Sequence, residues 1–443
     1  MSSSINPPLE ERIVGIECFY TADIPGIEGK LRTLPEDFIV IEKPLLPDRD
    51  DNGLYSIIEI TSRNWETNLL LKDLSKKLHI SRKKINFAGT KDKRALKTQY
   101  MSIKAPPEDI LRLDINDVKI KFLYKSNKPI KIGDLTGNKF DIKVRNINLE
   151  KNELIGRLEK IGSIIKGIRG FPNFFGIQRF GIIRPVTHLV GKSIIEGDFK
   201  EAVKHYIAHP TEHEKEPERK ARAFFHETED FKEAIKLYPD HLHFEKAILN
   251  KLIESNGDYI EALKILPFNL LTMFVYAYQS YIFNRILSER IRKGLPIDKA
   301  VEGDIIMPFS KNMFRENELI PVTRRNIEKV NREIAKGKAY VTGLLVGYDP
   351  VFAEGEMGEI EHRIIEEEKI DTRNFIIPEI PFLSSSGSRR SLLAPLDNLE
   401  WKINKDEINE GKLRVDFKFE LIKGSYATSL LREFMKSNDI TNY

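Results

Sequence analysis

The chain has 443 residues, which is long enough for two or three domains with a large apolar core. Charged residues make up 31% of the chain, yet the formal net charge is only +4, so a nucleic-acid-binding surface requires local clustering of cations. The single cysteine, Cys18, excludes an internal disulfide framework and a zinc site built on several thiolates. No apolar targeting segment is recognisable, and the apolar run 265–283 carries proline and polar side chains, which favours a buried helix over a membrane span. We therefore expect a soluble, cytoplasmic protein.

The first half of the chain alternates between strand and helix patterns. Runs of β-branched and apolar residues predict strands at 38–42, 54–60, 98–103, 118–124 and 139–144. Apolar residues at helical spacing predict helices at 66–78 and 150–166. Several strands follow one another closely enough to be antiparallel, which favours an α+β fold with a mixed sheet and flanking helices.

The composition shifts near residue 210, which is the best candidate for a domain boundary. In chain order, the patterns of the second half predict helices at 185–194 and 200–209, a charged linker at 210–222, helices over 223–262, a long helix at 268–292, loops and short strands over 300–385, a Ser/Gly-rich hinge at 384–390, a strand at 414–420 and a helix that ends near 434.

Residues 86–95 place one acid, Asp92, among cations directly after an apolar approach that ends at Gly89. Gly89 can adopt a positive φ and bend the chain sharply. A carboxylate surrounded by cations is held ionised, which suits a nucleophile that works on a polyanion. Charge pattern alone favours the alternative, an exposed turn with solvated charges, so both interpretations stand at this point.

Residues 167–181 combine four glycines with four phenylalanines, which is too apolar for an idle surface loop and too glycine-rich for a regular helix. Aromatic side chains on an irregular loop can stack on nucleic-acid bases. The alternative is that the phenylalanines fill an edge of the core.

Four sequence motifs occur together and in order: Pro-Glu-Asp-Phe at 35–38, Ala-Gly-x-Lys-Asp-Lys at 88–93, Asn-x-Phe-Gly-x-Gln-Arg-Phe-Gly at 173–181, and Gly-Ser-Tyr-Ala-Thr-Ser at 424–429. Together they resemble the TruD family of tRNA pseudouridine synthases. The resemblance spans residue 31 to about residue 434, although residues 210–265 carry no matching motif.

The resemblance implies a pseudouridine synthase fold, which is a mixed and largely antiparallel sheet with flanking helices. It also implies a large inserted α/β domain that is specific to the family. On this basis, residues 1–209 and 387–443 form the catalytic domain, and residues 210–386 form the inserted TRUD domain.

The implied activity is the isomerisation of a uridine to pseudouridine, at position 13 in the D-arm of tRNA if the chain follows family habit. This chemistry needs one carboxylate and neither a metal nor another cofactor. Asp92 matches the catalytic aspartate of the family, and Arg32 matches the basic residue that pairs with it. Family members often carry lysine at that position, so Arg32 preserves the charge but changes the geometry.

Four further residues match positions that contact the nucleotide. Asn173 would contact the uracil edge or the sugar, Phe175 would stack on the flipped base, and Phe38 would pack beside it. Tyr426 stands where the family often has phenylalanine. Five cations are candidates for contacts to the RNA backbone: Lys91, Lys93, Arg94, Arg179 and Arg184.

Two other classes of protein remain open at this stage. A catalytically silent RNA-binding factor could use the same scaffold. A carboxylate glycosidase needs two facing acids, and the only paired acids near a motif, Glu36 and Asp37, would point in opposite directions on a strand. For partners we expect tRNA, no membrane and a monomeric chain.

Overall fold

The structure is a computed structural model that describes residues 5–443, and the chain folds into two compact units. The sheet unit comprises residues 23–171, 310–313 and 394–443. The helix unit comprises residues 5–22, 172–309 and 314–393.

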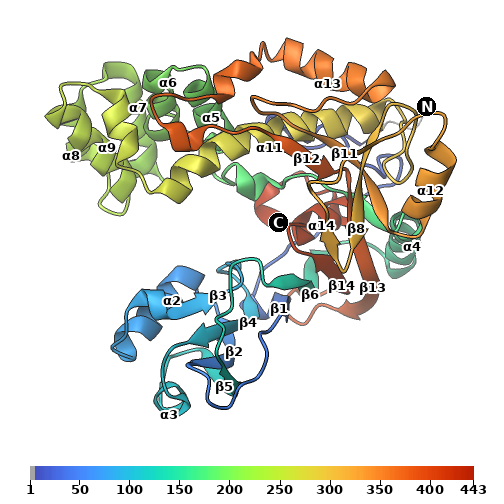
Figure 1. Cartoon of the computed structure of the whole chain (residues 1–443), viewed down its shortest axis with the longest axis horizontal. Helices are drawn as coiled ribbons and strands as arrows, with labels where there is room; N and C mark the ends of the chain where they lie inside the picture. The colour runs from blue at the N-terminus through green and yellow to red at the C-terminus, as the bar shows by residue number, and fades with distance from the viewer. Residues whose placement is uncertain (1–4) are drawn as a thin grey trace. The chain divides into compact units, whose positions relative to one another are not determined.

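A nine-stranded sheet forms the framework of the sheet unit (Figure 1). Its strands are β1 (Phe38–Pro44), β2 (Tyr55–Arg63), β3 (Ile85–Phe87), β4 (Leu96–Ile103), β5 (Val118–Ser126), β6 (Leu135–Ile147), β7 (Gly170–Pro172), β13 (Leu393–Lys405) and β14 (Leu413–Ile422). The strand order is β5-β2-β4-β1-β6-β14-β13-β7, and β3 pairs with β4 outside this path. Because β1 is parallel to β4 but antiparallel to β6, the sheet is mixed. This confirms the predicted fold class.

Helices cover the sheet where their apolar faces match its apolar positions. The helices of this unit are α2 (Thr67–Lys77), α3 (Pro107–Leu111), α4 (Lys151–Gly167) and α14 (Ala427–Met435). Leu158 of α4 and Phe434 of α14 share one fully buried cluster with Phe417 of β14. Burying such a side chain stabilises the fold by about 1.5–3 kcal/mol. Gly162 lets α4 approach closely, because a Cβ atom there would lie 2.3 Å from the Trp401 ring.

The helix unit is organised around one long helix, α11. Its helices are α1 (Leu9–Arg12), α5 (Thr187–Ile195), α6 (Phe199–Ile207), α7 (Glu216–Thr228), α8 (Phe231–Leu237), α9 (His243–Glu254), α10 (Tyr259–Lys264), α11 (Phe268–Arg292), α12 (Ile327–Ala335) and α13 (Gly355–Glu367). A second sheet is formed by β8 (Ile305–Ser310), β9 (Met313–Phe314), β10 (Ile320–Pro321), β11 (Ala339–Leu345) and β12 (Ser388–Ser391). Helix α11 runs from the group α5–α10 to this second sheet (Figure 1).

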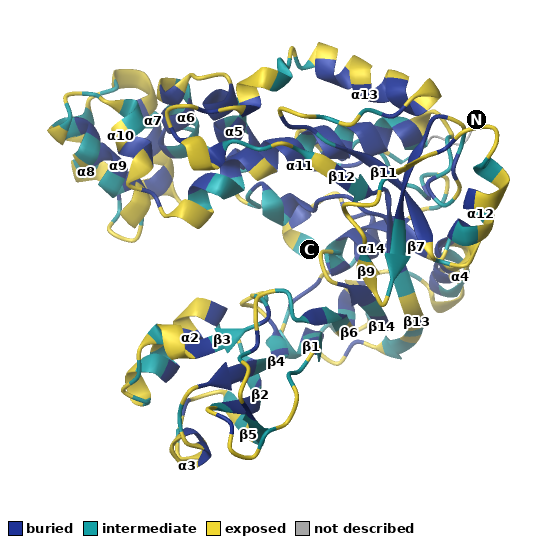
Figure 2. Cartoon of the chain, viewed as in Figure 1, coloured by how far each residue is buried: buried dark blue, intermediate teal, exposed yellow. Residues whose placement is uncertain are grey.

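The burial of α11 confirms the buried helix that the sequence predicts at 268–292. Phe274 and Phe283 are almost completely buried, and most of the helix is dark blue in Figure 2. Among the described residues, no helix is long and apolar enough to cross a membrane.

The sequence-based predictions for two regions in the second half of the chain are wrong. The predicted linker at 210–222 is helical from Glu216 onward, because Pro217 occupies the first turn of α7, where a missing N–H costs no hydrogen bond. The region 300–385, predicted as loops and short strands, contains the helices α12 and α13. The buried positions Met357, Ile360 and Ile364 of α13 follow helical spacing, so the pattern was present in the sequence.

Candidate functional site

Asp92 lies in the loop between β3 and β4, at the end of the sheet where β1 also begins. Since β1 and β4 run parallel, with Ile39 opposite Leu96, the segments that precede the two strands emerge at the same edge. Arg32 and Asp92 belong to these two segments. The parallel pairing therefore brings together two residues that are 60 positions apart in the sequence.

Arg32 holds the Asp92 carboxylate in place. Its Nη2 donates to Asp92 Oδ2 at 2.7 Å, and the exposed fractions of the two side chains are 9% and 51%. Among the described residues, the second carboxylate oxygen, Oδ1, receives no hydrogen bond. One oxygen is thus oriented by a buried guanidinium, while the carboxylate as a whole stays half-exposed and open to a reactant.

Arg32 is itself fixed by several contacts. Its guanidinium carbon lies 4.2 Å from the ring centre of Phe38, and its Nη1 donates to the backbone oxygen of Tyr443 at 3.2 Å. Burial lowers the pKa of Arg32, whereas Asp92 raises it, and an arginine in such a setting stays charged at neutral pH. Arg94 donates to the Arg32 carbonyl at 3.1 Å. Arg32 itself has a φ of 54°, a left-handed backbone conformation that residues with a Cβ atom rarely adopt.

The cations around Asp92 divide into a buried one and two exposed ones. Lys91 Nζ lies 2.5 Å from Glu42 Oε2, and the exposed fractions of these side chains are only 7% and 1%. Lys93 and Arg94 are exposed. Lys91 therefore neutralises a buried acid, which leaves Lys93 and Arg94 as the accessible cations of the loop.

Gly89 does not have the positive φ that we expected for this loop. A Cβ atom added to it would meet no atom within 4 Å. Its carbonyl accepts a hydrogen bond from Gln99 Nε2 at 2.8 Å. The loop is therefore shaped by side chains of β4 that bind its carbonyl groups, and not by a left-handed glycine.

The helix unit carries a second cluster of predicted residues. Asn173 Oδ1 accepts from Arg390 Nη2 at 2.6 Å, and the Arg390 guanidinium carbon lies 4.1 Å from the ring centre of Phe175. Phe175 makes an edge-to-face contact with Phe283, with ring centres 5.5 Å apart. Asn173 and Phe175 are only 4% and 8% exposed. The structure thus brings together the amide and the aromatic ring that the motif predicted.

The two predicted arginines of this unit differ in their surroundings. The Arg179 guanidinium carbon lies 5.7 Å from the Phe175 ring centre, and within the described chain its buried Nε has no hydrogen-bond partner. Arg184 donates to the carbonyls of His205, Tyr206 and His209. Burial lowers the pKa of Arg184 to about 10. Arg184 therefore braces the C-terminal end of α6 and the backbone just after it, whereas Arg179 remains close to Phe175.

The remaining predicted residues have the following places. Phe38 is 1% exposed and lies beneath Arg32, so its ring contacts that guanidinium and, edge to face, the Phe140 ring. Tyr426 is half-buried at the start of α14. Asp92 and Arg32 belong to the sheet unit, as do Phe38 and Tyr426, whereas Asn173 and Phe175 belong to the helix unit.

The acids of the Pro-Glu-Asp-Phe motif do not face a common site. They lie in a 3-10 turn, Pro35–Asp37, and not on the strand that we assumed. Asp37 is fully buried and accepts from Arg145 Nε at 2.8 Å, while Glu36 Oε1 pairs with Arg63 Nε at 2.5 Å. A glycosidase with this pair of acids is therefore excluded by geometry, since the two carboxylates serve different ion pairs.

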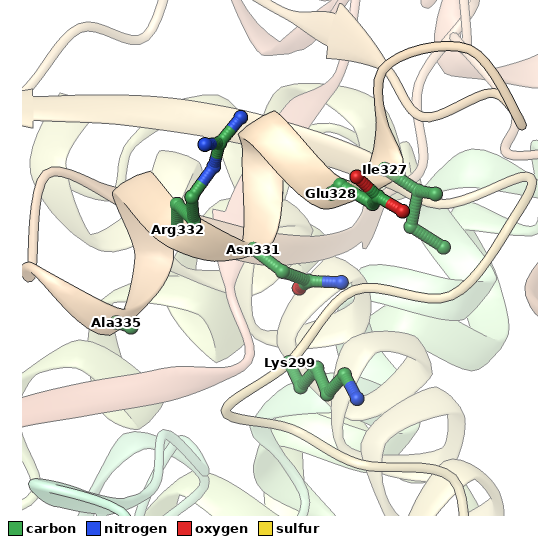
Figure 3. A pocket seen from close by; sticks show the side chains of 6 residues that line it. All are labelled: Lys299, Ile327, Glu328, Asn331, Arg332 and Ala335. Carbon is green, nitrogen blue, oxygen red and sulfur yellow. The ribbon is translucent and has the colours of Figure 1, made fainter.

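A shallow hollow of about 570 Å³ lies beside α12, with Lys299, Asn331 and Arg332 among its lining side chains (Figure 3). The side-chain amide of Asn331 is already hydrogen-bonded, because it binds both the N–H and the carbonyl of Ala300. The described residues contain no group of three or more His, Cys, Asp or Glu side chains arranged to hold a metal ion. None of the predicted site residues lines this hollow.

Sequence reasoning missed three residues that hold the predicted site residues in place: Lys97, Asn284 and Arg390. Lys97 is fully buried and contacts the backbone of Asp92. The available signal was the polar pair Lys97 and Gln99, which share one face of a strand directly after the loop. No comparable local signal exists for Asn284, which lies on a helix 109 positions after Phe175.

Comparison with known proteins assigns this chain to a family. Residues 13–434 match the family described as tRNA pseudouridine synthase D (TruD). A protein of Methanococcoides burtonii named as a tRNA pseudouridine synthase D is 46% identical, over 97% of this chain and 98% of that protein. A similarly named protein of Methanosarcina barkeri is 45% identical, again over 97% and 98% of the two chains.

A solved structure agrees with these relatives. The crystal structure of a Methanosarcina mazei protein named as a tRNA pseudouridine synthase D superposes with a TM-score of 0.87 at 42% identity, and covers 98% of this chain and 99% of that one. The fold is thus that of an isomerase class, the tRNA pseudouridine synthases. The chain belongs to the tRNA pseudouridine synthase D (TruD) family, which confirms the resemblance seen in its motifs.

Proposed function

We propose that this protein isomerises uridine to pseudouridine in tRNA, at position 13 of the D-arm, and that Asp92 is its catalytic carboxylate. Membership of the family supports the reaction and the class of substrate. The observation that carries the residue assignment is the half-exposed Asp92 carboxylate, with one oxygen 2.7 Å from a buried arginine and the other without a donor among residues 5–443.

The reaction breaks the bond from N1 of uracil to C1′ of the ribose and forms a bond from C5 to C1′. The hydrogen on C5 leaves as a proton and N1 gains one, so the product is an isomer of the substrate. An ionised carboxylate can start this sequence either by attack on C1′ or by removal of a sugar proton to give a glycal. Both routes place the charged group beside the sugar.

In this mechanism Arg32 orients the Asp92 carboxylate, because its guanidinium donates a hydrogen bond to one of the two oxygens. A guanidinium that is itself packed on Phe38 loses little freedom when it binds the carboxylate. The supporting role of Phe38 follows from its complete burial beneath Arg32.

Recognition of a flipped nucleotide needs both stacking and polar contacts. We propose that Phe175 stacks on the extruded base, that Asn173 binds the uracil edge or the sugar, and that Tyr426 contacts the nucleotide. Stacking of a base on an aromatic ring is worth about 1–3 kcal/mol and repays part of the cost of flipping. Lys93 and Arg94 supply exposed cations for the RNA backbone, and the half-buried Arg179 beside Phe175 is a further candidate.

The test is release of tritium from tRNA labelled at C5 of uridine, followed by mapping of pseudouridine in the product. Asp92→Asn should abolish release and leave the Kd for tRNA within about threefold, because the amide keeps the shape of the side chain but cannot act as a nucleophile. Asp114→Asn changes an exposed acid of the same unit and serves as the matched control.

Three results of this experiment would each contradict a part of the proposed function. Release of tritium by Asp92→Asn would remove Asp92 from the mechanism. Binding of tRNA without any release by the unmodified protein would favour a silent RNA-binding factor. Release with pseudouridine at another position would correct the assignment to position 13.

The division of the chain into a catalytic domain (1–209 and 387–443) and an inserted domain (210–386) stays a prediction. The two compact units describe how the chain packs, and compactness alone does not say which residues form a functional domain. A monomeric state and a cytoplasmic location likewise stay predictions, and sedimentation of the purified protein tests the first.

A further inference from the structure

Lys97 is a lysine that lies entirely inside the protein. It belongs to β4, and its exposed fraction is 0%. Burying an ammonium group is costly unless polar atoms surround it. A lysine retained in such a place therefore needs partners that account for its burial.

Four oxygen atoms lie close to the Lys97 ammonium. The shortest contact is to the carbonyl of Trp65 at 2.6 Å, and the hydroxyl of Thr67 follows at 3.3 Å. The other two are the carbonyls of Lys91 and Asp92, at 3.4 Å and 3.3 Å. One buried cation thus connects the segment that leads into α2 with the backbone of the Asp92 loop.

A second contact supports the same connection. The Thr67 hydroxyl, at the first residue of α2, also accepts the backbone N–H of Lys91 at 3.2 Å. Gln99 lies two residues after Lys97 on the same face of β4 and binds the Gly89 carbonyl. Side chains of β4, the strand that follows the loop, therefore bind the loop carbonyls at residues 89, 91 and 92.

We propose that Lys97 is a positioning residue for the Asp92 carboxylate, acting through the carbonyl groups of residues 91 and 92. The hydrogen bonds to these two carbonyls fix the direction of the backbone at Asp92, so that the carboxylate meets Arg32 with the other oxygen left open. This inference rests on the proposed catalytic role of Asp92. It adds a residue that touches neither the substrate nor the reacting atoms.

The charge of Lys97 gives this role a dependence on pH. Burial lowers the pKa of Lys97 to about 8, the carboxylates of Glu66 and Asp92 raise it, and the cation Lys91 lowers it further. Above pH 8 the ammonium becomes an amine with two N–H bonds facing four oxygen atoms. The hydrogen bonds from Lys97 to the carbonyl groups of the loop should therefore weaken as the pH rises through this value.

The experiment compares the unmodified protein with Lys97→Met, which keeps the length of the side chain and removes every donor. Single-turnover tritium release from labelled tRNA is measured from pH 6.5 to pH 9.5, together with the Kd for tRNA and amide hydrogen exchange of residues 88–96. Lys104→Met, an exposed lysine just after β4, is the matched control.

For Lys97→Met at pH 7 we expect a single-turnover rate about tenfold lower, because small misplacements of a reacting group have large effects on rate. The Kd should stay within about threefold, and exchange at residues 90–95 should be faster. The rate difference should narrow above pH 8, where the lysine of the unmodified protein loses its proton. Lys97→Gln keeps a neutral donor and should recover part of the rate.

A purely structural role predicts a different set of results. If Lys97→Met has the normal rate and normal loop exchange, or if the rate ratio is the same at every pH, the proposal is wrong. If Lys97→Met does not fold, Lys97→Gln takes its place in the test. A rate ratio between Lys97→Gln and the unmodified protein that is the same at every pH would then show that the proposal is wrong. Activity of Asp92→Asn would instead overturn the proposed role of Asp92, whatever Lys97→Met does.

Discussion

Asn284 binds both backbone groups of Phe175. Its Oδ1 accepts from the Phe175 N–H at 2.9 Å, and its Nδ2 donates to the Phe175 carbonyl at 3.0 Å. The same Nδ2 donates to the carbonyl of Val14 at 3.0 Å. Since Asn284 is fully buried on α11, it holds the phenylalanine-rich loop against a rigid helix. An irregular segment is thereby given the fixed position that an aromatic platform needs.

Phe175→Leu should separate stacking on a base from packing in the core. Leucine retains most of the apolar volume, so the loss in stability should stay near 1.5 kcal/mol or less, whereas stacking worth about 1–3 kcal/mol would be lost. The Kd for tRNA should therefore rise by about 5–150-fold. Binding assays and thermal unfolding measure the two effects on the same protein.

The control for this variant is Phe283→Leu, which removes the ring that contacts the edge of Phe175. It should lower the melting temperature to a similar extent and leave the Kd nearly unchanged. Equal effects of the two variants on tRNA binding would mean that Phe175 is only a core residue.

Several parts of this site could be predicted from sequence because they depend on local motifs. The loop that presents Asp92 and the aromatic loop around Phe175 both carry unusual residue combinations at fixed spacing. The individual strands were predictable for a similar reason, since the patterns of β2, β4 and β6 are strong. Each of these features can be read from a window of about ten residues.

The features that escaped prediction depend on contacts between distant segments. Lys97 resembles a solvent-facing strand residue until α2 and the Asp92 loop are known to cover it. The pairing of Lys91 with Glu42 and of Asp37 with Arg145 depends on which strands become neighbours. The sequence therefore shows which residues can carry a charge, but the fold decides whether each of them faces solvent or a buried partner.

Arg32→Met should lower the rate of isomerisation by about 100–1,000-fold, because the group that orients and stabilises the Asp92 carboxylate is lost. Arg32→Lys should retain more activity, since the charge persists. It should still be slower than the unmodified protein, because one ammonium cannot make the contacts that the guanidinium makes to Asp92, Tyr443 and Phe38.

Single-turnover rates on labelled tRNA check this order of activity. Arg63→Met removes an arginine that pairs with an exposed acid of the same unit and provides the comparison. A normal rate for Arg32→Met would show that Asp92 works without a cationic partner.

Lys93→Ala should weaken binding of tRNA and make it less dependent on salt. Each lost phosphate contact reduces the slope of log K against log salt by about 0.7–0.9. Lys91→Met should leave the slope unchanged and instead destabilise the protein by about 3–5 kcal/mol, because Glu42 would be buried without its partner.

Filter binding at several salt concentrations and urea unfolding test this division of roles. A reduced slope for Lys91→Met would show that Lys91 leaves Glu42 to bind RNA. An unchanged slope for Lys93→Ala would remove that residue from the RNA contacts.

Asp406→Asn should change how stability depends on pH. Asp406 accepts from the buried Arg145 at 2.9 Å. Burial alone would raise the pKa of Asp406, but hydrogen bonds from the Asn146 backbone, Asn409 and Arg145 outweigh it and lower the pKa below its usual value. A folded-state pKa below the unfolded one means that this stabilisation is present above about pH 4 and is lost as the pH falls further.

The asparagine variant should accordingly be less stable at pH 7, by about 1–3 kcal/mol, and should lose less stability than the unmodified protein between pH 4 and pH 2.5. Urea unfolding at both ends of this range measures the difference. Asp114→Asn, which alters an exposed acid, should stay within about 0.5 kcal/mol of the unmodified protein at pH 7. Parallel pH profiles for Asp406→Asn and the unmodified protein would show that Asp406 does not titrate with a lowered pKa. The acid sensitivity of the fold would then come from other carboxylates, such as Glu407, whose pKa is lowered by its contact with Arg145.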